Sequence, residues 1–490
     1  MMQAQIRRVA WGLVASFLIV FAQLNYVQIF AAEDIASNDS NIRSLLAEYS
    51  IKRGDIETLD FETVARSRKT QDRFQYLRTY PGGELYGHIT GYYSLIYGSD
   101  RIEATYSEQL LGESGVISMQ DIQDTFLNSG ERGDDVRLTV HSQLQQVAAE
   151  ALGGQEGSVV ALDPSSGEVR AMYSNPTYDP GPLSTHDTEA IRAYRRSLRP
   201  NSPDSPLLSK ATSRSFPPGS TFKVVTAAAA LDSGRFDATS TFPDPEALDL
   251  PLTDNTLTNF TNTSCTGTGS IDLFTALVQS CDTTFALLGL RLPDELRRTA
   301  GALGFNEPLP FDVGTAASTF PDVPDDQEPL RAFAGIGQGD VAATPLQMAL
   351  VAAAVANGGQ VPRPQLVREV RDPSGSVIEQ QRSAPLGRAF SAATAQELTR
   401  MMTSVVTEGT GTAAQIDGVE VAGKTGTAQT VEGAAPHAWF ICFAPASNPR
   451  IAVAVLVENG GELGSEATGG AVAAPIAKAL IEADQRIRQW

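Results

Sequence analysis

Short apolar runs separated by turn residues predict strands in two parts of the chain. Three runs lie near the C-terminal end: Val419 to Gln429, Ala438 to Ala444 and Ile451 to Val457. Two more, Ser158 to Leu162 and Val169 to Tyr173, are joined by turn formers and predict a hairpin. Strands are therefore expected at both ends of a large C-terminal region.

Apolar residues at helical spacing fill the region between those strands. The spacing predicts a helix over about 144–151 that ends before Gly153. Alanine-rich segments at 223–231 and 346–356 and a closing segment from about Ala473 to Ile487 are further helices. Strands at both ends with helices between them predict an antiparallel sheet flanked by helices, an α+β fold.

The N-terminal segment has a different pattern. An apolar run of 24 residues, Val9 to Ala32, follows Arg7 and Arg8, and residues 1–32 contain no acidic side chain. A helix needs about 20 residues to cross the hydrocarbon core, and flanking basic residues stay in the cytoplasm. We expect an uncleaved membrane anchor with a cytoplasmic N-terminus and an extracytoplasmic remainder. The alternative is a cleaved signal peptide.

These patterns divide the chain into four parts. We expect a cytoplasmic tail (1–8), a transmembrane anchor (9–32), a smaller domain rich in turn signals (33–134) and the α+β domain (135–490). The two folded parts are within the usual size range of domains or above it.

Composition limits the partners and the chemistry. The 490 residues carry 37 basic and 57 acidic side chains, a net charge of −20, so no basic excess exists for nucleic acid. The four histidines are scattered and the three cysteines form no C-x-x-C pair, so we expect neither a metal site nor a cofactor. Cys265 and Cys281 are a candidate disulfide that the sequence leaves open, whereas Cys442 is expected in a buried strand.

The use of lysine narrows the search for a site. Only six of the 37 basic residues are lysine, at positions 52, 69, 210, 223, 424 and 478. Arginine stays protonated in proteins, whereas lysine can lose its proton. A retained lysine therefore indicates a place that needs a titratable amine, unless the six are only a result of biased composition.

Ser220 and Lys223 form the first candidate pair. Pro217, Pro218 and Gly219 do not fit inside a helix, whereas the run after Ser220 propagates one well. Ser220 is thus expected at a helix N-terminus, with Lys223 on the same face. A serine nucleophile, an amine base and the N–H groups of a helix start suit acyl transfer. The simpler interpretation is a helix cap beside a solvated lysine.

Two further elements carry polar residues in apolar surroundings. An amphipathic helix over Ile271 to Gln279 leads into Ser280 and Asp282, which a helix–helix turn would also explain. A predicted strand carries Lys424, Thr425, Gly426 and Thr427. Strand alternation places the two threonines on one face and Lys424 on the other, and Gly426 lets a substrate backbone approach.

Together the three elements are far more specific than any one alone. Ser220-x-x-Lys223, Ser280-x-Asp282 and Lys424-Thr425-Gly426 occur in the order of the S-x-x-K, S-x-N and K-T-G motifs of serine acyltransferases. The chain resembles the class B penicillin-binding proteins, peptidoglycan D,D-transpeptidases, over nearly its full length. Its size, its anchor and the Ser-Cys-Asp-Thr context are closest to an actinobacterial subgroup of that family. Further segments that carry the resemblance are Val160 to Glu168, Gly337-Gln338-Gly339, Thr344 to Met348, Arg53-Gly54-x-Ile56, Gly87 to Gly91 and Ile102-Glu103.

The resemblance implies roles for the site residues. Ser220 would attack the penultimate D-Ala of a stem peptide, with Lys223 as general base. Ser280 would relay the proton and Lys424 would support that relay. The side chains of Thr425 and Thr427 would bind the substrate carboxylate. The N–H groups of Ser220 and Thr427 would form the oxyanion hole, and β-lactams would react at the same serine.

The resemblance also implies location and partners. The smaller domain would be a non-catalytic pedestal, and the catalytic domain would lie outside the cell membrane. Implied partners are stem peptides ending in D-Ala-D-Ala, a membrane glycosyltransferase and other division or elongation proteins, which implies a role in cell division or cell shape.

Position 282 departs from the family pattern. An ionised Asp cannot donate a hydrogen bond as Asn does, and its charge raises the pKa of a neighbouring lysine. Reduced or differently tuned activity is therefore the hypothesis for this position. Two alternatives to a transpeptidase stay open: a catalytically impaired scaffold, and a D,D-carboxypeptidase or β-lactamase on the same fold.

Overall fold

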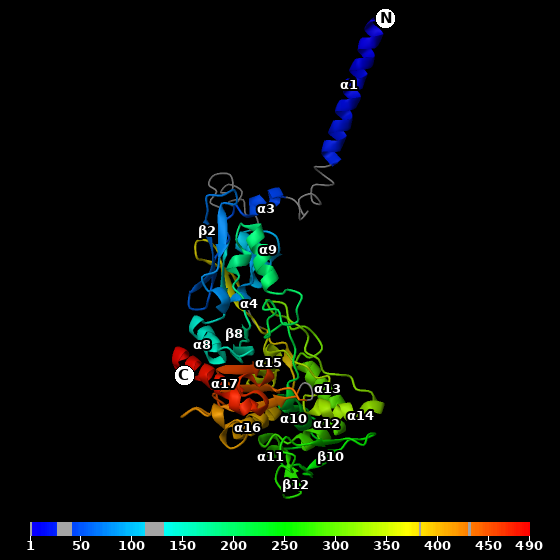
Figure 1. The fold of residues 1–490 in the computed structure, drawn as a ribbon, viewed down its shortest axis with the longest axis vertical. Coiled ribbons are helices and arrows are strands. Elements are labelled where there is room, and N and C mark those ends of the chain that lie inside the picture. Colours follow the sequence, from blue (N-terminus) through cyan, green and yellow to red (C-terminus); the bar gives the residue numbers. More distant parts are fainter. Residues whose placement is uncertain (1, 27–41, 113–131, 382–383, 430–432) are drawn as a thin grey trace.

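The computed structural model describes residues 2–26, 42–112, 132–381, 384–429 and 433–490. Two lobes follow one another along the long axis of the molecule (Figure 1). The larger lobe is built on a five-stranded antiparallel sheet in the order β17-β18-β19-β7-β8. Its strands are β17 (Ala422–Ala428), β18 (His437–Ala444), β19 (Ile451–Val457), β7 (Gly157–Leu162) and β8 (Val169–Asn175).

Each face of this sheet is covered by helices. Alternate side chains of β18 enter two separate apolar clusters, with Trp439 and Ile441 in one and Phe440 and Cys442 in the other. Helix α15 (Pro345–Ala356) packs on the first face, and α8 (Ser142–Leu152) and α17 (Ala474–Arg488) pack on the second. The predicted α+β fold with a helix-flanked antiparallel sheet is confirmed.

The remaining elements of this lobe surround the sheet. The helices are α10 (Lys223–Asp232), α11 (Leu273–Val278), α12 (Asp282–Arg291), α13 (Pro293–Ala302), α14 (Glu328–Gly335) and α16 (Ala392–Thr407), with short turns η4 (Gly219–Phe222), η5 (Asp325–Gln327), η6 (Thr412–Ala414), η7 (Glu458–Glu466) and η8 (Gly469–Ala473). The small strands are β9 (Thr241–Pro243), β10 (Ala247–Asp249), β11 (Thr256–Thr258), β12 (Ser270–Asp272), β13 (Gln360–Val361) and β16 (Gly387–Arg388).

The smaller lobe contains a six-stranded sheet in the order β15-β14-β6-β1-β2-β3. Its strands are β1 (Ile56–Glu57), β2 (Thr63–Lys69), β3 (Tyr76–Thr79), β6 (Asp135–Leu138), β14 (Val367–Arg371) and β15 (Val377–Gln380). Around it lie α3 (Ile42–Glu48), η2 (Gly83–Leu85), α4 (Gly87–Thr90), β4 (Tyr93–Ser94), β5 (Gly98–Ser99), α5 (Arg101–Thr105), α6 (Ser107–Leu111), η3 (Gly181–Leu183) and α9 (Thr188–Ser197). Strands from residues 367–380 and helix α9 thus join this lobe from far along the chain, and a domain boundary at 134/135 stays a prediction.

A buried ionic network lies inside the smaller lobe. Glu103 accepts a hydrogen bond from Arg53 Nε at 2.7 Å and one from Arg78 Nε at 2.6 Å. All three side chains are at most 3% exposed. Two buried guanidiniums around one carboxylate hold α5, β3 and the segment before β1 together.

Most predicted elements agree with the structure to within a few residues, and one differs in kind. The segment expected as one helix from Ile271 to Gln279 begins as strand β12 and becomes helix α11 only at Leu273. The reason is local, because Ile271 pairs with Phe242 of β9 and the Asp272 carboxylate caps α11 by accepting from Thr275 N–H.

The N-terminal helix α1 runs over Met2–Asn25. In the parts of the chain that the structure describes, no helix qualifies by length and apolarity as a membrane span. Residues 27–32 of the predicted anchor lie outside the described residues.

Candidate active site

Ser220 lies on a short turn that leads directly into a helix. The turn η4 (Gly219–Phe222) precedes α10, as the sequence pattern predicts. Gly219 has φ of 52°, a conformation that favours glycine, and its N–H donates to Gly337 O at 2.9 Å. Among the described residues the Ser220 hydroxyl has no hydrogen-bond partner, and the residue is partly exposed. The nucleophile candidate is therefore free to meet a substrate.

Two contacts fix the loop before Ser220. Trp439 Nε1 on β18 donates to Pro217 O at 2.9 Å, and Thr221 Oγ1 donates to Pro218 O at 2.7 Å. Sequence reasoning missed Trp439 as a site residue, because its apolar neighbours indicate only a buried strand. Gly337 belongs to a segment that carries the family resemblance, but no pattern in the sequence ties it to the turn.

Lys223 is fully buried in the first turn of α10 and reaches the second motif. Its Nζ donates to Asp282 Oδ1 at 2.7 Å and to Ser280 O at 2.7 Å, and lies 3.4 Å from Ser280 Oγ. Burial lowers the pKa of Lys223, and the carboxylate of Asp282 opposes that shift without cancelling it. The amine is thus moved toward the neutral form that a base requires.

Ser280 and Asp282 lie at the junction of α11 and α12. Ser280 has φ of 61°, a left-handed conformation that is uncommon for serine, and Asp282 is the first residue of α12. The Ser280 hydroxyl lies between two lysines, because Lys424 Nζ also donates to Ser280 Oγ at 2.9 Å. The turn thus brings both lysine amines to one hydroxyl.

Lys424 projects from β17, the edge strand of the sheet. It is fully buried, and burial together with the nearby charge of Lys223 lowers its pKa well below the ordinary value, with Asp282 acting in the opposite direction. A third buried lysine, Lys210, instead forms ion pairs with Glu156 at 2.8 Å and Glu458 at 2.5 Å. Two of the three buried lysines therefore belong to the site.

The other residues of β17 divide between its two faces. A Cβ on Gly426 would lie 2.9 Å from Pro218 O, so this glycine allows the nucleophile turn itself to approach the strand. Thr425 is buried, and its hydroxyl lies 2.6 Å from that of Thr410, a partner that sequence reasoning missed. Thr427 is partly exposed. The structure brings the three predicted motifs together at one place.

A disulfide ties the second motif to a neighbouring loop. Cys265 and Cys281 are bonded, which settles the pairing that the sequence leaves open. Asn259 Oδ1 accepts from Thr283 N–H at 3.1 Å on the same loop. Asp244 lies beside the two sulfurs, but their mutual bond leaves no thiolate to hold a metal ion. Cys442 is a free, buried strand residue, as expected.

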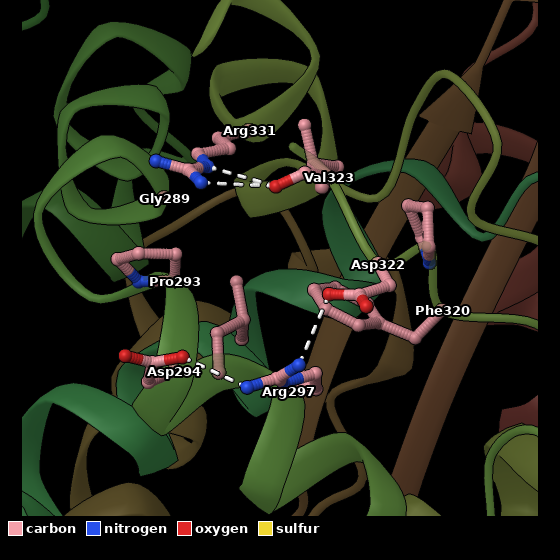
Figure 2. A pocket seen from close by; sticks show the side chains of 11 residues that line it. Gly289, Pro293, Asp294, Arg297, Phe320, Asp322, Val323 and Arg331 are labelled. Atoms are coloured by element: carbon pink, nitrogen blue, oxygen red, sulfur yellow. Dashed lines mark hydrogen bonds and ion pairs between the residues drawn. The ribbon is translucent and has the colours of Figure 1, made fainter. Parts of the chain in front are cut away.

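A separate cavity of about 120 Å³ lies between α12, α13 and α14 (Figure 2). Arg297 bridges its rim, with Nη2 2.9 Å from Asp294 Oδ1 and Nη1 3.0 Å from Asp322 Oδ1. Its lining includes none of the eight predicted site residues.

Comparison with known proteins finds a matching family for each lobe. Residues 157–482 match the family described as "Penicillin binding protein transpeptidase domain", and residues 53–136 match "Penicillin binding protein A dimerisation domain". The chain is 41% identical over 497 residues to peptidoglycan D,D-transpeptidase PbpA of Mycolicibacterium smegmatis, with 99% of each chain covered. The protein of the same name from Mycobacterium tuberculosis is 39% identical, with 98% of this chain and 99% of that one covered.

Solved structures agree. The ceftriaxone acyl-enzyme complex of penicillin-binding protein A from M. tuberculosis superposes with a TM-score of 0.84 at 40% identity, covering 90% of this chain and 99% of that one. The penicillin G acyl-enzyme complex of the same protein gives 0.82 at 39% identity, covering 89% and 99%.

Proposed function

The chain belongs to the penicillin-binding protein transpeptidases, and from that premise we propose how its site works and where it acts. It is a serine-type peptidoglycan D,D-transpeptidase that β-lactams acylate. Its substrate is the stem peptide of peptidoglycan, and its inhibitors react at the nucleophilic serine. No cofactor takes part in the proposed steps.

Ser220 is the nucleophile and Lys223 its base. The Ser220 oxygen bonds to the carbonyl carbon of the penultimate D-Ala while the serine proton passes to the neutral Lys223 amine. The N–H groups of Ser220 and Thr427 stabilise the oxyanion that forms. Strand β17 is a sheet edge, and a Cβ on Gly219 would lie 3.1 Å from Thr427 O, so the backbone of Thr427 lies beside the turn that carries Ser220, which supports this role.

Ser280 carries the proton to the leaving group. The bond to the terminal D-Ala nitrogen breaks as that nitrogen receives a proton from the Ser280 hydroxyl, which is resupplied by the adjacent lysines. The amine of a neighbouring stem then attacks the acyl carbonyl carbon, the ester bond to Ser220 breaks, and the proton that the amine loses returns to the Ser220 oxygen through Lys223. Thr425 and Thr427 bind the carboxylate of the donor peptide, and Lys424 maintains the orientation of Ser280.

The observation that carries this mechanism is the shared hydroxyl of Ser280. Lys424 Nζ lies 2.9 Å and Lys223 Nζ 3.4 Å from its oxygen, inside a site where burial lowers the pKa of both amines. Two buried lysine amines that contact one hydroxyl form a connected proton path. If the three motifs had only a structural role, there would be no reason for this arrangement.

Intact-mass analysis of the protein after exposure to penicillin G tests the proposal. We expect one penicilloyl adduct, mapped to Ser220 and absent in Ser220→Ala. Ser215→Ala, a change at an exposed serine on the same loop, is the matched control and keeps the adduct. A missing adduct in the parent protein would support the impaired scaffold instead. Rapid loss of the adduct would support the β-lactamase or carboxypeptidase.

We also propose that residues 9–32 anchor the protein in the cell membrane with the N-terminus in the cytoplasm. An acid-free N-terminus, the helix α1 and the exposure of large apolar side chains along it, such as Phe17 and Ile19, support this. Such an anchor places the catalytic lobe beside its substrate during division or elongation, together with a membrane glycosyltransferase. Extraction of the native chain from membranes by detergent but not by alkaline carbonate tests the anchor.

A further inference from the structure

Basic residues gather in the smaller lobe although the chain as a whole is strongly acidic. The hairpin from Thr63 to Thr79 carries five basic residues and one acid, and helix α9 with the two residues after it carries four and one. In the hairpin, Arg66, Arg68, Lys69 and Arg73 are exposed, and in the second segment Arg192, Arg196 and Arg199 are exposed. These seven exposed residues are called the basic cluster below.

The structure brings the two basic segments together. His186, just before α9, lies 2.5 Å from Asp72 Oδ2 through Nδ1 and 3.1 Å from Tyr76 O through Nε2. Asp72 is the only acid in the hairpin and this contact occupies it. Within the described ranges, Arg66, Arg68 and Lys69 have no acidic partner. Their charge therefore stays available.

The same place is where the chain arrives from its N-terminal helix. Tyr49, which follows α3, packs on Phe74 of the hairpin and lies 5.8 Å from the His186 ring, centroid to centroid. Helix α3, strand β2 and helix α9 lie at the end of the molecule nearest α1 (Figure 1). An open hollow of about 540 Å³ lies on the hairpin, with Arg66 and Arg68 on its lining together with Tyr80.

We propose that the basic cluster docks on anionic phospholipid headgroups of the membrane that holds the anchor. This inference rests on the proposed anchoring. The rest of the ectodomain is acidic and is repelled by such a surface, so the cluster is the part of the lobe that the surface attracts. Arginine binds phosphate through paired N–H donors, which suits a headgroup in the hollow between Arg66 and Arg68. Docking there would point the catalytic lobe away from the lipid.

Hydrogen exchange of the full chain in lipid nanodiscs tests the proposal. The turn after β2 and edge strand β3 are the reporters, from Thr70 to Thr79. We expect exchange roughly tenfold slower in discs containing phosphatidylglycerol than in phosphatidylcholine discs, because each basic residue near an anionic surface adds to the attraction. About 1 M salt should remove the difference, because the Debye length falls to about 3 Å.

Two variants with the same change in net charge separate the cluster from charge in general. Arg66→Glu, Arg68→Glu and Lys69→Glu together should abolish the protection. Arg235→Glu, Arg298→Glu and Arg400→Glu, three exposed arginines of the larger lobe, should leave it intact. Equal exchange in both kinds of disc, or equal loss of protection in both variants, overturns the proposal. Either result would leave a protein partner as the alternative for the basic cluster.

Separate measurements test the proposed anchor and the proposed mechanism. Co-migration of the chain with phosphatidylcholine discs reports the anchor, and the rate of penicillin acylation reports the active site. Both variants should keep both properties. Loss of co-migration with intact lipid-dependent protection would refute the anchor alone.

Discussion

Asp282 sets the balance of charge around Lys223, the proposed base. Lys223 and Lys424 bring two amines to the Ser280 hydroxyl, and Asp282 is the carboxylate hydrogen-bonded to Lys223. Burial lowers the pKa of both lysines, and the charge of Lys223 lowers that of Lys424 further. The carboxylate works against these shifts. Asp282 thus limits how far the pKa of Lys223 falls, whereas Asn at this position would favour the neutral amine more strongly.

Replacement of Asp282 by Asn should shift the pH dependence of acylation. Without the carboxylate the ammonium form of Lys223 is less stable, so its pKa falls further and the base form persists at lower pH. The acid limb of kcat/KM for penicillin G should move to lower pH, with a faster reaction at neutral pH. The measurement is a pH–rate profile of acylation. Asp312→Asn, a change outside the site, is the control, and coincident profiles for parent and Asp282→Asn would refute the role of the charge.

At the scale of elements, the turn that carries Ser220 packs so closely on strand β17 that only glycine fits at position 426. A Cβ on Gly426 would lie 2.9 Å from Pro218 O and from the methyl group of Thr221. The turn carrying Ser220 is thus positioned by a strand from the other end of the domain. The position of Ser220, the proposed nucleophile, depends on this packing as much as on its own helix.

Gly426→Ala should therefore slow acylation while the protein stays folded. The added methyl group displaces the turn by a fraction of an ångström, and misplacement on that scale costs about 10- to 100-fold in rate. Stopped-flow acylation by a chromogenic β-lactam measures it. Gly387→Ala on strand β16, where nothing lies within 4 Å of the new methyl group, should leave the rate unchanged. Equal rates for Gly426→Ala and the parent would show that the turn tolerates the shift.

The sequence predicts regular elements well and their distant partners poorly. Strands β18 and β19 follow from unbroken apolar runs, and Ser220 at a helix start follows from Pro217 to Gly219. The left-handed turn at Ser280 and the bond from Trp439 to Pro217 depend on contacts made only after folding. Strands β14 and β15 join the smaller lobe because β14 pairs with β6, and no local pattern reveals such pairing.

At the scale of the whole molecule, the two lobes are joined through several crossings of the chain. Strand β6 of the smaller lobe pairs with β1 from the N-terminal side and with β14 from deep within the chain. The Thr139 hydroxyl, just after β6, donates to Val169 O at 2.7 Å, and Val169 is the first residue of β8 in the sheet of the larger lobe. A change that destabilises one lobe should therefore also destabilise the other.

Glu103→Gln tests this coupling. The carboxylate's pKa is raised by burial but lowered more by Arg78 and Arg53, which hold it below its ordinary value. Removing the charge leaves two buried guanidiniums uncompensated, at a cost of about 3–5 kcal/mol. Urea unfolding followed by the fluorescence of the buried Trp439, in the other lobe, should show an earlier transition. Glu379→Gln on the exposed strand β15 is the control. A Trp439 transition that does not move would indicate independent lobes.

The Glu103 carboxylate also predicts how the stability of the protein depends on pH. Because the pKa of Glu103 is lowered on folding, its contribution is present above the unfolded-state pKa of about 4.3 and is lost as the pH falls through the folded-state value. Stability of the parent protein should fall across this acidic range, and that of Glu103→Gln should fall less. Parallel pH dependence of the two proteins in the same urea series would exclude Glu103 as the source.

The Cys265–Cys281 bond bears on how the enzyme must be made. It joins cysteines 16 positions apart and includes the residue between Ser280 and Asp282, and such a bond forms and persists in an oxidising compartment. Chain made in a reducing cytosol would carry two thiols there and lose about 3 kcal/mol of constraint on that loop. Under the anchoring proposed above, this bond would form only after export, so a chain still in the cytosol would lack the constraint on its second motif.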